Sequence, residues 1–361
     1  MFVGLRNTDW TQETEDLVKK IPHYDSCSSS LYRQRAKLLP PLPKTRQDLN
    51  LEGAWRQTTA GENFIVTDDD DMVILATADN LRHLSAADTW FCDGTFKSCP
   101  KLFSQLYTVH AFIDGDMFPL VYGLLPDKKE ATYKKFFTAI QNASPVRLAP
   151  TRIFMDFESA AWNGVSSVFP GIEMKGCFFH YTQCIIRYSR ESCKLAIAFK
   201  ENAEVQKFVR RAAVLPLVPL DRLDDVWLYA LDHRPSEVPD VDKFADYVTE
   251  HWVTRDGRSA WNHYETTGPR TTNHVEGWHH KVNNLVKSPH PNIYKLLTII
   301  KNMQAKNETA IIQLEATGRR KYKKNKYRDL EEDMQNLKRR FQQGHMPVQT
   351  YADAASFHIN F

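Results

Sequence analysis

Hydrophobic and polar positions follow a strand-like pattern between residues 90 and 125. Residues 90–96, 103–113 and 117–125 are rich in aromatic and β-branched side chains, and each run has the length of a strand. The turn sequence Asp114-Gly115-Asp116 separates the last two runs. We therefore predict three strands with short connections, which is typical of an antiparallel meander.

Helical spacing then alternates with short strands. Residues 131–142 place apolar side chains on one helical face, and residues 160–169 also predict a helix. Short apolar runs at 152–155 and 174–179 predict a fourth and a fifth strand, and a further helix begins at His180. Three strands, helix, strand, helix, strand, helix is the element order of an RNase H-like fold. We predict an α/β fold of this type, with a mixed five-stranded sheet flanked by helices.

The rest of the chain suggests a division into segments. Two β-prone runs, 63–67 and 72–77, predict a small hairpin after a polar N-terminal arm, and residues 193–269 show helical patterns separated by prolines. We predict an N-terminal arm and small hairpin region at 1–84, the first part of the α/β core at 85–192, an all-helical insertion at 193–269, the completion of the core at 270–302, and a basic, charged helical tail at 303–361.

Composition places the chain among soluble globular proteins. Of 361 residues, 42% are hydrophobic and 25% are charged, which is ordinary for this class. The sequence contains no apolar run of membrane-spanning length, and the first residues contain no apolar signal region, so we expect neither a membrane protein nor a secreted one. The six cysteines are scattered, which favours free thiols in a reducing compartment.

Basic residues concentrate near the C-terminus. The net charge of +3 is too small to indicate a nucleic-acid partner by itself. A run between residues 319 and 328 contains basic side chains and no acid, and it could hold DNA phosphates without sequence preference. A solvated helix face or a nuclear-import signal explains the run equally well. The basic residues are Arg319, Arg320, Lys321, Lys323, Lys324, Lys326 and Arg328.

Three acids on different elements are the candidate catalytic residues. Asp93 lies near the end of the first strand and Asp156 follows the fourth, and these two strands are neighbours in an RNase H-like sheet. Glu276 lies beside the apolar stripe of a helix that follows Thr271-Thr272-Asn273. Carboxylates on rigid elements can hold two divalent ions for phosphoryl transfer, and oxygen ligands suit Mg²⁺ or Mn²⁺. We expect the three acids to bind two such ions.

Each acid also has a structural interpretation. Asp93 and Gly94 could form a turn at the strand end, and Asp156 could help to start the next helix. Glu276 would close a capping box if Asn273 were the N-cap. Glu158 is a competing carboxylate, which we place at best in a supporting position because the residues after it predict a turn into a helix.

Three further residues are candidate accessory groups. Cys177 and His180 have the spacing of half a zinc site, with Cys184 as a possible third ligand, but no fourth ligand is evident nearby, so we do not expect zinc. A position of His180 facing the active site, near DNA phosphates or the metal ions, is at least as plausible. His279 and the next residue, His280, could approach a phosphate, although a solvent-facing pair is the default expectation.

Several blocks in order resemble the transposase domain of Mutator-like elements (MULE). The resemblance covers residues 81–302 and implies a DDE-type enzyme on an RNase H-like fold, with a helical insertion before the last acid. It also implies Asp93, Asp156 and Glu276 as the metal triad and Cys177 and His180 as the Cys-x-x-His element. The blocks are Asp93-Gly94-Thr95-Phe96, Gln105-Leu106-Tyr107-Thr108-Val109, Pro119-Leu120-Val121-Tyr122-Gly123-Leu124-Leu125-Pro126, Met155-Asp156-Phe157-Glu158-Ser159-Ala160, Gly176-Cys177-Phe178-Phe179-His180-Tyr181 and Thr272-Asn273-His274-Val275-Glu276-Gly277-Trp278-His279.

We therefore expect a metal-dependent DNA transposase, or a truncated copy of one, that cleaves DNA strands and transfers them. The resemblance implies DNA as partner, a homo-oligomer on DNA and a nuclear location, with the cytoplasm as the alternative. Residues 1–84 contain one cysteine, Cys27, so they cannot hold a Cys–His finger for DNA recognition. This departure favours the alternative function, a domesticated and catalytically inactive DNA- or chromatin-binding protein derived from a transposase.

Overall fold

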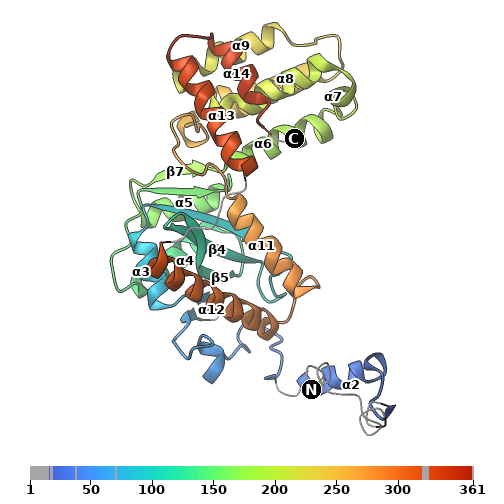
Figure 1. Ribbon diagram of the computed structural model, residues 1–361, viewed down its shortest axis with the longest axis vertical. Coiled ribbons are helices and arrows are strands. Elements are labelled where there is room, and N and C mark those ends of the chain that lie inside the picture. The colour runs from blue at the N-terminus through green and yellow to red at the C-terminus, as the bar shows by residue number, and fades with distance from the viewer. Residues whose placement is uncertain (1–15, 17–18, 37–38, 70, 319–324, 360–361) are drawn as a thin grey trace. The chain divides into compact units, whose positions relative to one another are not determined.

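A seven-stranded mixed sheet holds the strands in the order β1-β2-β5-β4-β3-β6-β7 (Figure 1). From β5 to β7 this is the strand order of an RNase H-like fold, with β3 antiparallel to β4 and parallel to β6. The predicted α/β class and the side-by-side first and fourth core strands are confirmed. The strands are β1 (Ile65–Asp68), β2 (Val73–Leu75), β3 (Thr89–Thr95), β4 (Gln105–Ile113), β5 (Asp116–Leu125), β6 (Arg152–Met155) and β7 (Glu173–Gly176).

The sheet has two strands more than predicted, because the small hairpin joins its edge. β2 pairs antiparallel with β5, with Val73 opposite Leu124 and Leu75 opposite Tyr122. All three residues of β2 are buried. The two strands of the hairpin were visible in the sequence, but their pairing with β5 is a long-range contact that alternation of polar and apolar residues does not reveal. The expected five-stranded sheet is therefore corrected to seven strands.

The computed structural model describes the chain apart from residues 1–15, 17–18, 37–38, 70, 319–324 and 360–361. The chain divides into two compact units, Met1–Leu49 and Asn50–Phe361. The first unit contains helix α2 (Tyr24–Ala36). The sheet and the candidate site both belong to the second unit.

The two faces of the sheet are covered by different helices. On β3, Trp90 and Cys92 point to the face that packs against Phe136 of α4 and Val165 of α5. The alternate residue Phe91 points to the opposite face, where it packs against Val275 of α11. We call these the α4 face and the α11 face. The helices are α4 (Glu130–Ala143), α5 (Ser159–Val168) and α11 (Asn273–Val286).

The α11 face is also joined to α12 and α3 by buried polar contacts. Asn80 of α3 and Gln304 of α12 exchange two amide hydrogen bonds, of 3.1 and 2.9 Å. The Tyr122 hydroxyl of β5 donates to the same Gln304 side chain at 3.1 Å. These bonds fix α12 over the strands beneath α11. The helices are α3 (Ala78–Ala86) and α12 (Ile293–Thr317).

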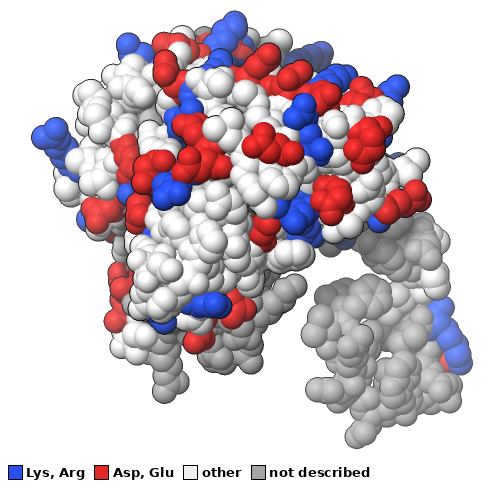
Figure 2. Space-filling model, turned by 90° about the horizontal axis from the view of Figure 1, so that it is seen from above, with Lys and Arg blue, Asp and Glu red and all other residues white. Residues whose placement is uncertain are grey.

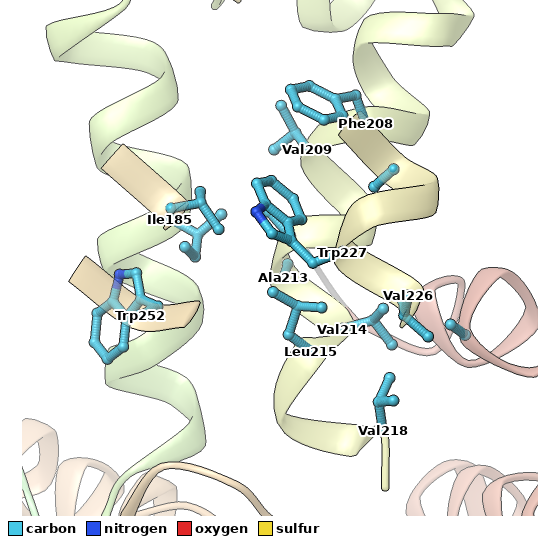
Figure 3. Close-up of a cluster of buried hydrophobic side chains, with 14 of the residues drawn as sticks. Ile185, Phe208, Val209, Ala213, Val214, Leu215, Val218, Val226, Trp227 and Trp252 are labelled. Atoms are coloured by element: carbon cyan, nitrogen blue, oxygen red, sulfur yellow. The ribbon is translucent and has the colours of Figure 1, made fainter. Parts of the chain in front are cut away.

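Residues 193–269, all of which the structure describes, contain helices and no strand, as the proline-separated apolar patterns predict. Their buried side chains form a core of their own together with α6 (Figure 3). The Trp227 and Phe208 rings stack within it, with centroids 5.6 Å apart, and Ile185 of α6 faces Trp227. The helices are α6 (Phe178–Arg187), α7 (Ala198–Glu201), α8 (Ala203–Val214), α9 (Leu223–Asp232) and α10 (Val241–Val248).

The C-terminal helices complete this second core. Tyr351 and Ala355 of α14 are buried in the cluster formed by the insertion, and Met334 of α13 joins them. The Arg211 guanidinium of α8 donates to both carboxylate oxygens of Asp353, at 2.7 and 2.9 Å. Residues distant in the sequence therefore build one helical lobe. The two helices are α13 (Asn325–Gln342) and α14 (Val348–Ser356).

The charged surface is mixed on the face shown in Figure 2. Lys and Arg side chains are interspersed there with Asp and Glu side chains. Among the described residues, this face presents both signs of charge rather than a continuous basic surface. Within the described part of the chain, no helix combines the length and apolar character needed to span a membrane.

Candidate active site

Asp93 on β3 and Asp156, the residue after β6, lie at equivalent positions along two neighbouring parallel strands. β3 and β6 pair with Trp90 opposite Ile153 and Phe91 opposite Phe154. Each aspartate comes two residues after the second pair, so strand alternation directs both toward the α11 face. The two phenylalanine rings stack, with centroids 5.0 Å apart and planes inclined by 6°. The strands therefore bring the two candidate ligands to the same end of these central strands, which we call the carboxylate edge of the sheet.

The turn interpretation of Asp93 is wrong, because β3 continues past it. Asp93, Gly94 and Thr95 pair with Thr108, Tyr107 and Leu106 of β4. A side chain on Gly94 would put its Cβ 2.4 Å from Oε1 of Gln105 on the α4 face. This glycine therefore makes room for a buried side chain of the sheet.

Asp156 does not start the helix that follows it. The N-cap of α5 is Glu158, and α5 has no side-chain cap. One Asp156 carboxylate oxygen accepts a hydrogen bond from the Phe157 amide at 2.7 Å. Its side chain is half exposed, at 52%. One carboxylate oxygen is therefore fixed by a hydrogen bond, while the side chain remains accessible from solvent.

Glu276 reaches the same edge from α11. Val275 packs on Phe91 and Phe154, and this small apolar cluster fixes the start of α11 against the two strands. Glu276 is the next residue, with a side chain that is 29% exposed. Thr272 is the N-cap, with no side-chain capping bond, so the predicted capping box at Asn273 is absent. Each of the three acids thus follows a residue of one buried cluster.

His180 lies between two of the acids. Its Nδ1 atom is 3.7 Å from Oδ1 of Asp156, and its Nε2 atom is 3.6 Å from Oε1 of Glu276. Burial lowers the pKa of His180, but Cys177 and the carboxylates of Asp156 and Asp93 raise it more, to about 9. His180 therefore lies among the candidate acids, in agreement with a position facing the active site.

Two buried polar atoms at this edge have no hydrogen-bond partner among the described residues. They are Nδ1 of His180 and Oε1 of Glu276. Burial raises the pKa of Glu276, the neighbouring His180 opposes the rise, and the charges of Asp93 and Asp156 add to it. An unpartnered carboxylate oxygen beside two further carboxylates is a donor set that a hard divalent cation fits. The residues present are therefore compatible with Mg²⁺ or Mn²⁺.

Asp93 has two polar neighbours, the Gly94 amide and the His279 ring. Its Oδ1 atom accepts from the Gly94 amide at 2.8 Å, and its Oδ2 atom is 3.3 Å from Nδ1 of His279. His279 is buried, so the default expectation of a solvent-facing histidine is wrong for this residue. It is right for His280, which is exposed. The two neighbours differ because position 279 of α11 faces the sheet and position 280 faces away from it.

Cys177 has a different set of neighbours from those expected. Its sulfur accepts hydrogen bonds from the backbone amide and the hydroxyl of Thr272, both at 3.2 Å. Ligand atoms of Cys177, His180 and Glu276 lie within 4.8 Å of one another. The third member of this group is therefore Glu276 and not Cys184. Three ligands still leave a structural zinc site without its fourth.

Glu158 is occupied by other partners. The Tyr133 hydroxyl donates to one of its carboxylate oxygens at 2.9 Å, and Lys128 donates to the other at 3.0 Å. Both oxygens are therefore engaged, in agreement with a supporting place for this carboxylate.

Two polar residues near Asp93 were missed in the sequence. Thr108 lies directly opposite Asp93 on β4, and His110 lies two residues further along the same strand. Both are buried. Their signal was present as two polar side chains on one face of an otherwise apolar strand, a pattern that calls for hydrogen-bond partners. The helix that supplies the partner is more than 160 residues away in the sequence, which is why spacing alone did not connect them.

The basic run falls outside what the structure describes. Residues 319–324 are not described, and no side chain between residues 319 and 329 is. The predicted DNA contacts of Arg319, Arg320, Lys321, Lys323, Lys324, Lys326 and Arg328 therefore stay predictions.

A protein-family model matches the part of the chain that forms strands β3 to β7. Residues 89–184 match the family model of the MULE transposase domain. The matched range contains Asp93, Asp156, Cys177 and His180 and ends before Glu276. The match supports a transposase-related function. No curated protein matches the sequence.

Proposed function

Because this chain carries a MULE transposase domain at residues 89–184, we propose that it is a DDE-type DNA transposase that cleaves DNA strands and transfers them. Asp93, Asp156 and Glu276 are the proposed catalytic and metal-binding residues. The observation that carries the proposal is their shared anchoring, because each acid closely follows a member of the buried cluster of Phe91, Phe154 and Val275.

The proposed cofactor is a pair of Mg²⁺ or Mn²⁺ ions held by these three carboxylates. When bound, such ions activate the attacking oxygen and stabilise the leaving oxygen of a phosphodiester. The protein contributes rigidity, since Asp93 lies within β3, Asp156 directly follows β6, and Glu276 stands on a helix packed over these strands. His180 separates the Asp156 and Glu276 carboxylates and limits how closely they approach each other.

Partners and location follow from the same proposal. A transposase acts on DNA, so we propose DNA as substrate, assembly as a homo-oligomer on it, and a nuclear location. The basic residues between 319 and 328 are the proposed contacts to DNA phosphates, which would make binding depend steeply on salt.

A second candidate is a DNA- or chromatin-binding protein derived from a transposase and without catalysis. The basic residues between 319 and 328, which could bind DNA phosphates without catalysis, favour it. In that case the carboxylate edge would be retained as structure, and binding would rest on the basic residues.

A nicking experiment separates the two candidates. The full chain is incubated with supercoiled plasmid and Mn²⁺ or Mg²⁺, and the conversion to open circles is measured. We expect metal-dependent nicking that Asp93→Asn, Asp156→Asn and Glu276→Gln each abolish, while Asp256→Asn at an exposed loop position leaves it unchanged. Nicking that survives Asp93→Asn would refute the catalytic proposal. Salt-sensitive DNA binding without any nicking would establish the second candidate.

A further inference from the structure

We propose that His279, Thr108 and His110 form a buried hydrogen-bond chain that positions the Asp93 carboxylate for metal binding. The role of Asp93 as a ligand rests on the proposed function. The hydrogen-bond chain itself rests on the geometry of three elements, β3, β4 and α11, and it involves residues outside the three-acid set.

The topology of the sheet sets up this chain. Asp93 of β3 and Thr108 of β4 are directly opposite each other in an antiparallel pair, so their side chains share one face. His110 lies two residues along β4 and points to the same face. α11 crosses this face and places His279 over the strand pair.

Three short contacts link the four side chains. Nδ1 of His279 lies 3.3 Å from Oδ2 of Asp93. Nε2 of the same ring lies 3.0 Å from the Thr108 hydroxyl. That hydroxyl lies 3.0 Å from Nε2 of His110. Thr108, His110 and His279 are 0%, 1% and 5% exposed, so water does not compete for these bonds.

The Asp93 carboxylate fixes which nitrogen of His279 donates at its end of the chain. The Asp93 carboxylate only accepts, so Nδ1 of His279 must carry the hydrogen that faces it. In a neutral ring the Nε2 atom is then an acceptor, and it takes the Thr108 hydroxyl hydrogen. The oxygen of Thr108 in turn accepts from Nε2 of His110. Burial keeps the pKa of His110 well below its ordinary value, which fits a neutral donor at the far end.

The competing arrangement uses a longer contact. The Thr108 hydroxyl could instead donate to the backbone carbonyl of Asp93, which is 3.4 Å away. Nε2 of His279 would then donate to the Thr108 oxygen, and the ring would carry a hydrogen on both nitrogens. Both arrangements use the two 3.0 Å contacts, and in both a hydrogen on Nδ1 of His279 faces the Asp93 carboxylate.

The consequence is a carboxylate fixed at both oxygens. The Gly94 amide holds Oδ1 at 2.8 Å and His279 holds Oδ2 at 3.3 Å, so rotation of the group is restricted before any ion arrives. Groups that orient metal ligands typically change metal affinity by about 10- to 100-fold when they are removed. His279 and Thr108 are therefore positioning residues in this proposal and not ligands.

Paired variants of the full chain test the proposal by Mn²⁺ binding, measured by calorimetry. Thr108→Val removes the hydroxyl at nearly constant shape and Thr108→Ser keeps it. We expect about a 10-fold or greater loss of Mn²⁺ affinity for Thr108→Val and near wild-type affinity for Thr108→Ser. His279→Asn retains a donor toward Asp93 and should lose less affinity than His279→Leu. His280→Asn, on the exposed side of α11, should leave the affinity unchanged.

Nitrogen NMR of histidine-labelled wild-type protein provides a readout that needs no variant. We expect His279 to carry a hydrogen on Nδ1 and His110 to be neutral with its hydrogen on Nε2. A His279 ring with its only hydrogen on Nε2, or equal Mn²⁺ affinity of Thr108→Val and Thr108→Ser, would overturn the chain. If Asp93→Asn weakens Mn²⁺ binding while His279→Leu does not, the positioning role alone is wrong. If Asp93→Asn has no effect on Mn²⁺ binding, the proposed metal site itself fails.

Discussion

The rings of Phe91 and Phe154 stack almost parallel, with centroids 5.0 Å apart, and each ring lies two residues before a candidate metal ligand. Because alternate residues of a strand share a face, the ring contact and the two carboxylates form successive layers on the α11 face. Val275 completes the layer of rings and carries Glu276 beside it. The apolar layer thus sets the spacing of the acids.

Removing one ring should disturb both stability and metal binding. Phe154 is 1% exposed, and Phe154→Ala should lower the free energy of unfolding by about 3–5 kcal/mol, as deletions of buried aromatic side chains do. Urea unfolding measures this, and calorimetry should show weaker Mn²⁺ binding. Ile312→Ala, at a position 65% exposed, should change stability by less than about 0.5 kcal/mol. Unchanged Mn²⁺ affinity in a folded Phe154→Ala protein would contradict the spacing role.

Gly176, at the end of β7, packs against the residue that follows Asp156 and so helps to place Asp156. A Cβ there would lie 2.1 Å from the ring of Phe157, the residue after Asp156. Gly176→Ala should therefore displace that ring, lower the free energy of unfolding by about 1–3 kcal/mol as overpacking does, and reduce nicking. Circular dichroism during urea unfolding and the plasmid assay measure the two effects. Equal stability and activity in the variant would refute this account.

Gly277 on α11 is the control for Gly176, because it has open space where Gly176 has none. A Cβ at this helical position meets nothing within 4 Å. Gly277→Ala should raise the free energy of unfolding by roughly 0.5–1 kcal/mol, because alanine loses less backbone entropy in a helix than glycine does. The same urea titration checks the sign, and a decrease in stability would contradict the open space seen here.

Stability should fall in mild acid because of His263. Burial, helped by the nearby cations Lys175, Arg270 and Arg152 and opposed by the hydrogen bond to the Gly176 carbonyl, lowers the pKa of His263 from an ordinary value of 6.5 to about 3. Its Nε2 atom lies 2.9 Å from the Gly176 carbonyl, to which a neutral ring donates. Below pH 6.5 the unfolded chain therefore binds a proton that the folded chain does not, so stability decreases as pH falls toward 3.

The expected loss from His263 between pH 7 and pH 5 is roughly 2 kcal/mol. Urea midpoints at the two pH values measure the loss, and His263→Gln should reduce it because that side chain does not titrate. An equal loss in the variant would assign the pH dependence to other groups.

The contact between α8 and α14 should be strongly stabilising. The Arg211 side chain is 4% exposed, and Asp353→Ala would leave its charge buried without a carboxylate, with only the Tyr229 ring against it. We expect a loss of about 3 kcal/mol or more in the free energy of unfolding. Asp225→Ala, which breaks an exposed pair with Arg222, should cost about 1 kcal/mol or less. Similar losses in the two variants would contradict the burial argument.

Local patterns were enough to predict the order of the core elements and the strand ends that carry Asp93 and Asp156. Strand alternation and helical spacing are short-range properties, and the parallel neighbours β3 and β6 follow from the element order. The neighbours of Glu276 were harder to foresee. The structural alternative of a capping box depended on Asn273 being the N-cap, and a shift of one residue to Thr272 removes it.

Long-range packing is what the sequence did not reveal. His279 and His280 are adjacent and chemically identical, so only the direction of α11 over the sheet decides which one reaches Asp93. The edge pairing of β2 with β5 and the burial of α14 against α8 are contacts of the same kind. They join segments whose own patterns are equally compatible with other partners.

The helical lobe also has a consequence for the order in which the molecule can be completed. Its core combines residues 193–269 with Tyr351, Ala352 and Ala355 near the end of the chain. During synthesis the segment from 193 to 269 must therefore wait for these last residues before its apolar side chains are fully covered. Contacts of such sequence separation form slowly and leave surface exposed meanwhile. The strands of the α/β sheet can pair earlier, so the core of the sheet can be completed before the core of the helical lobe.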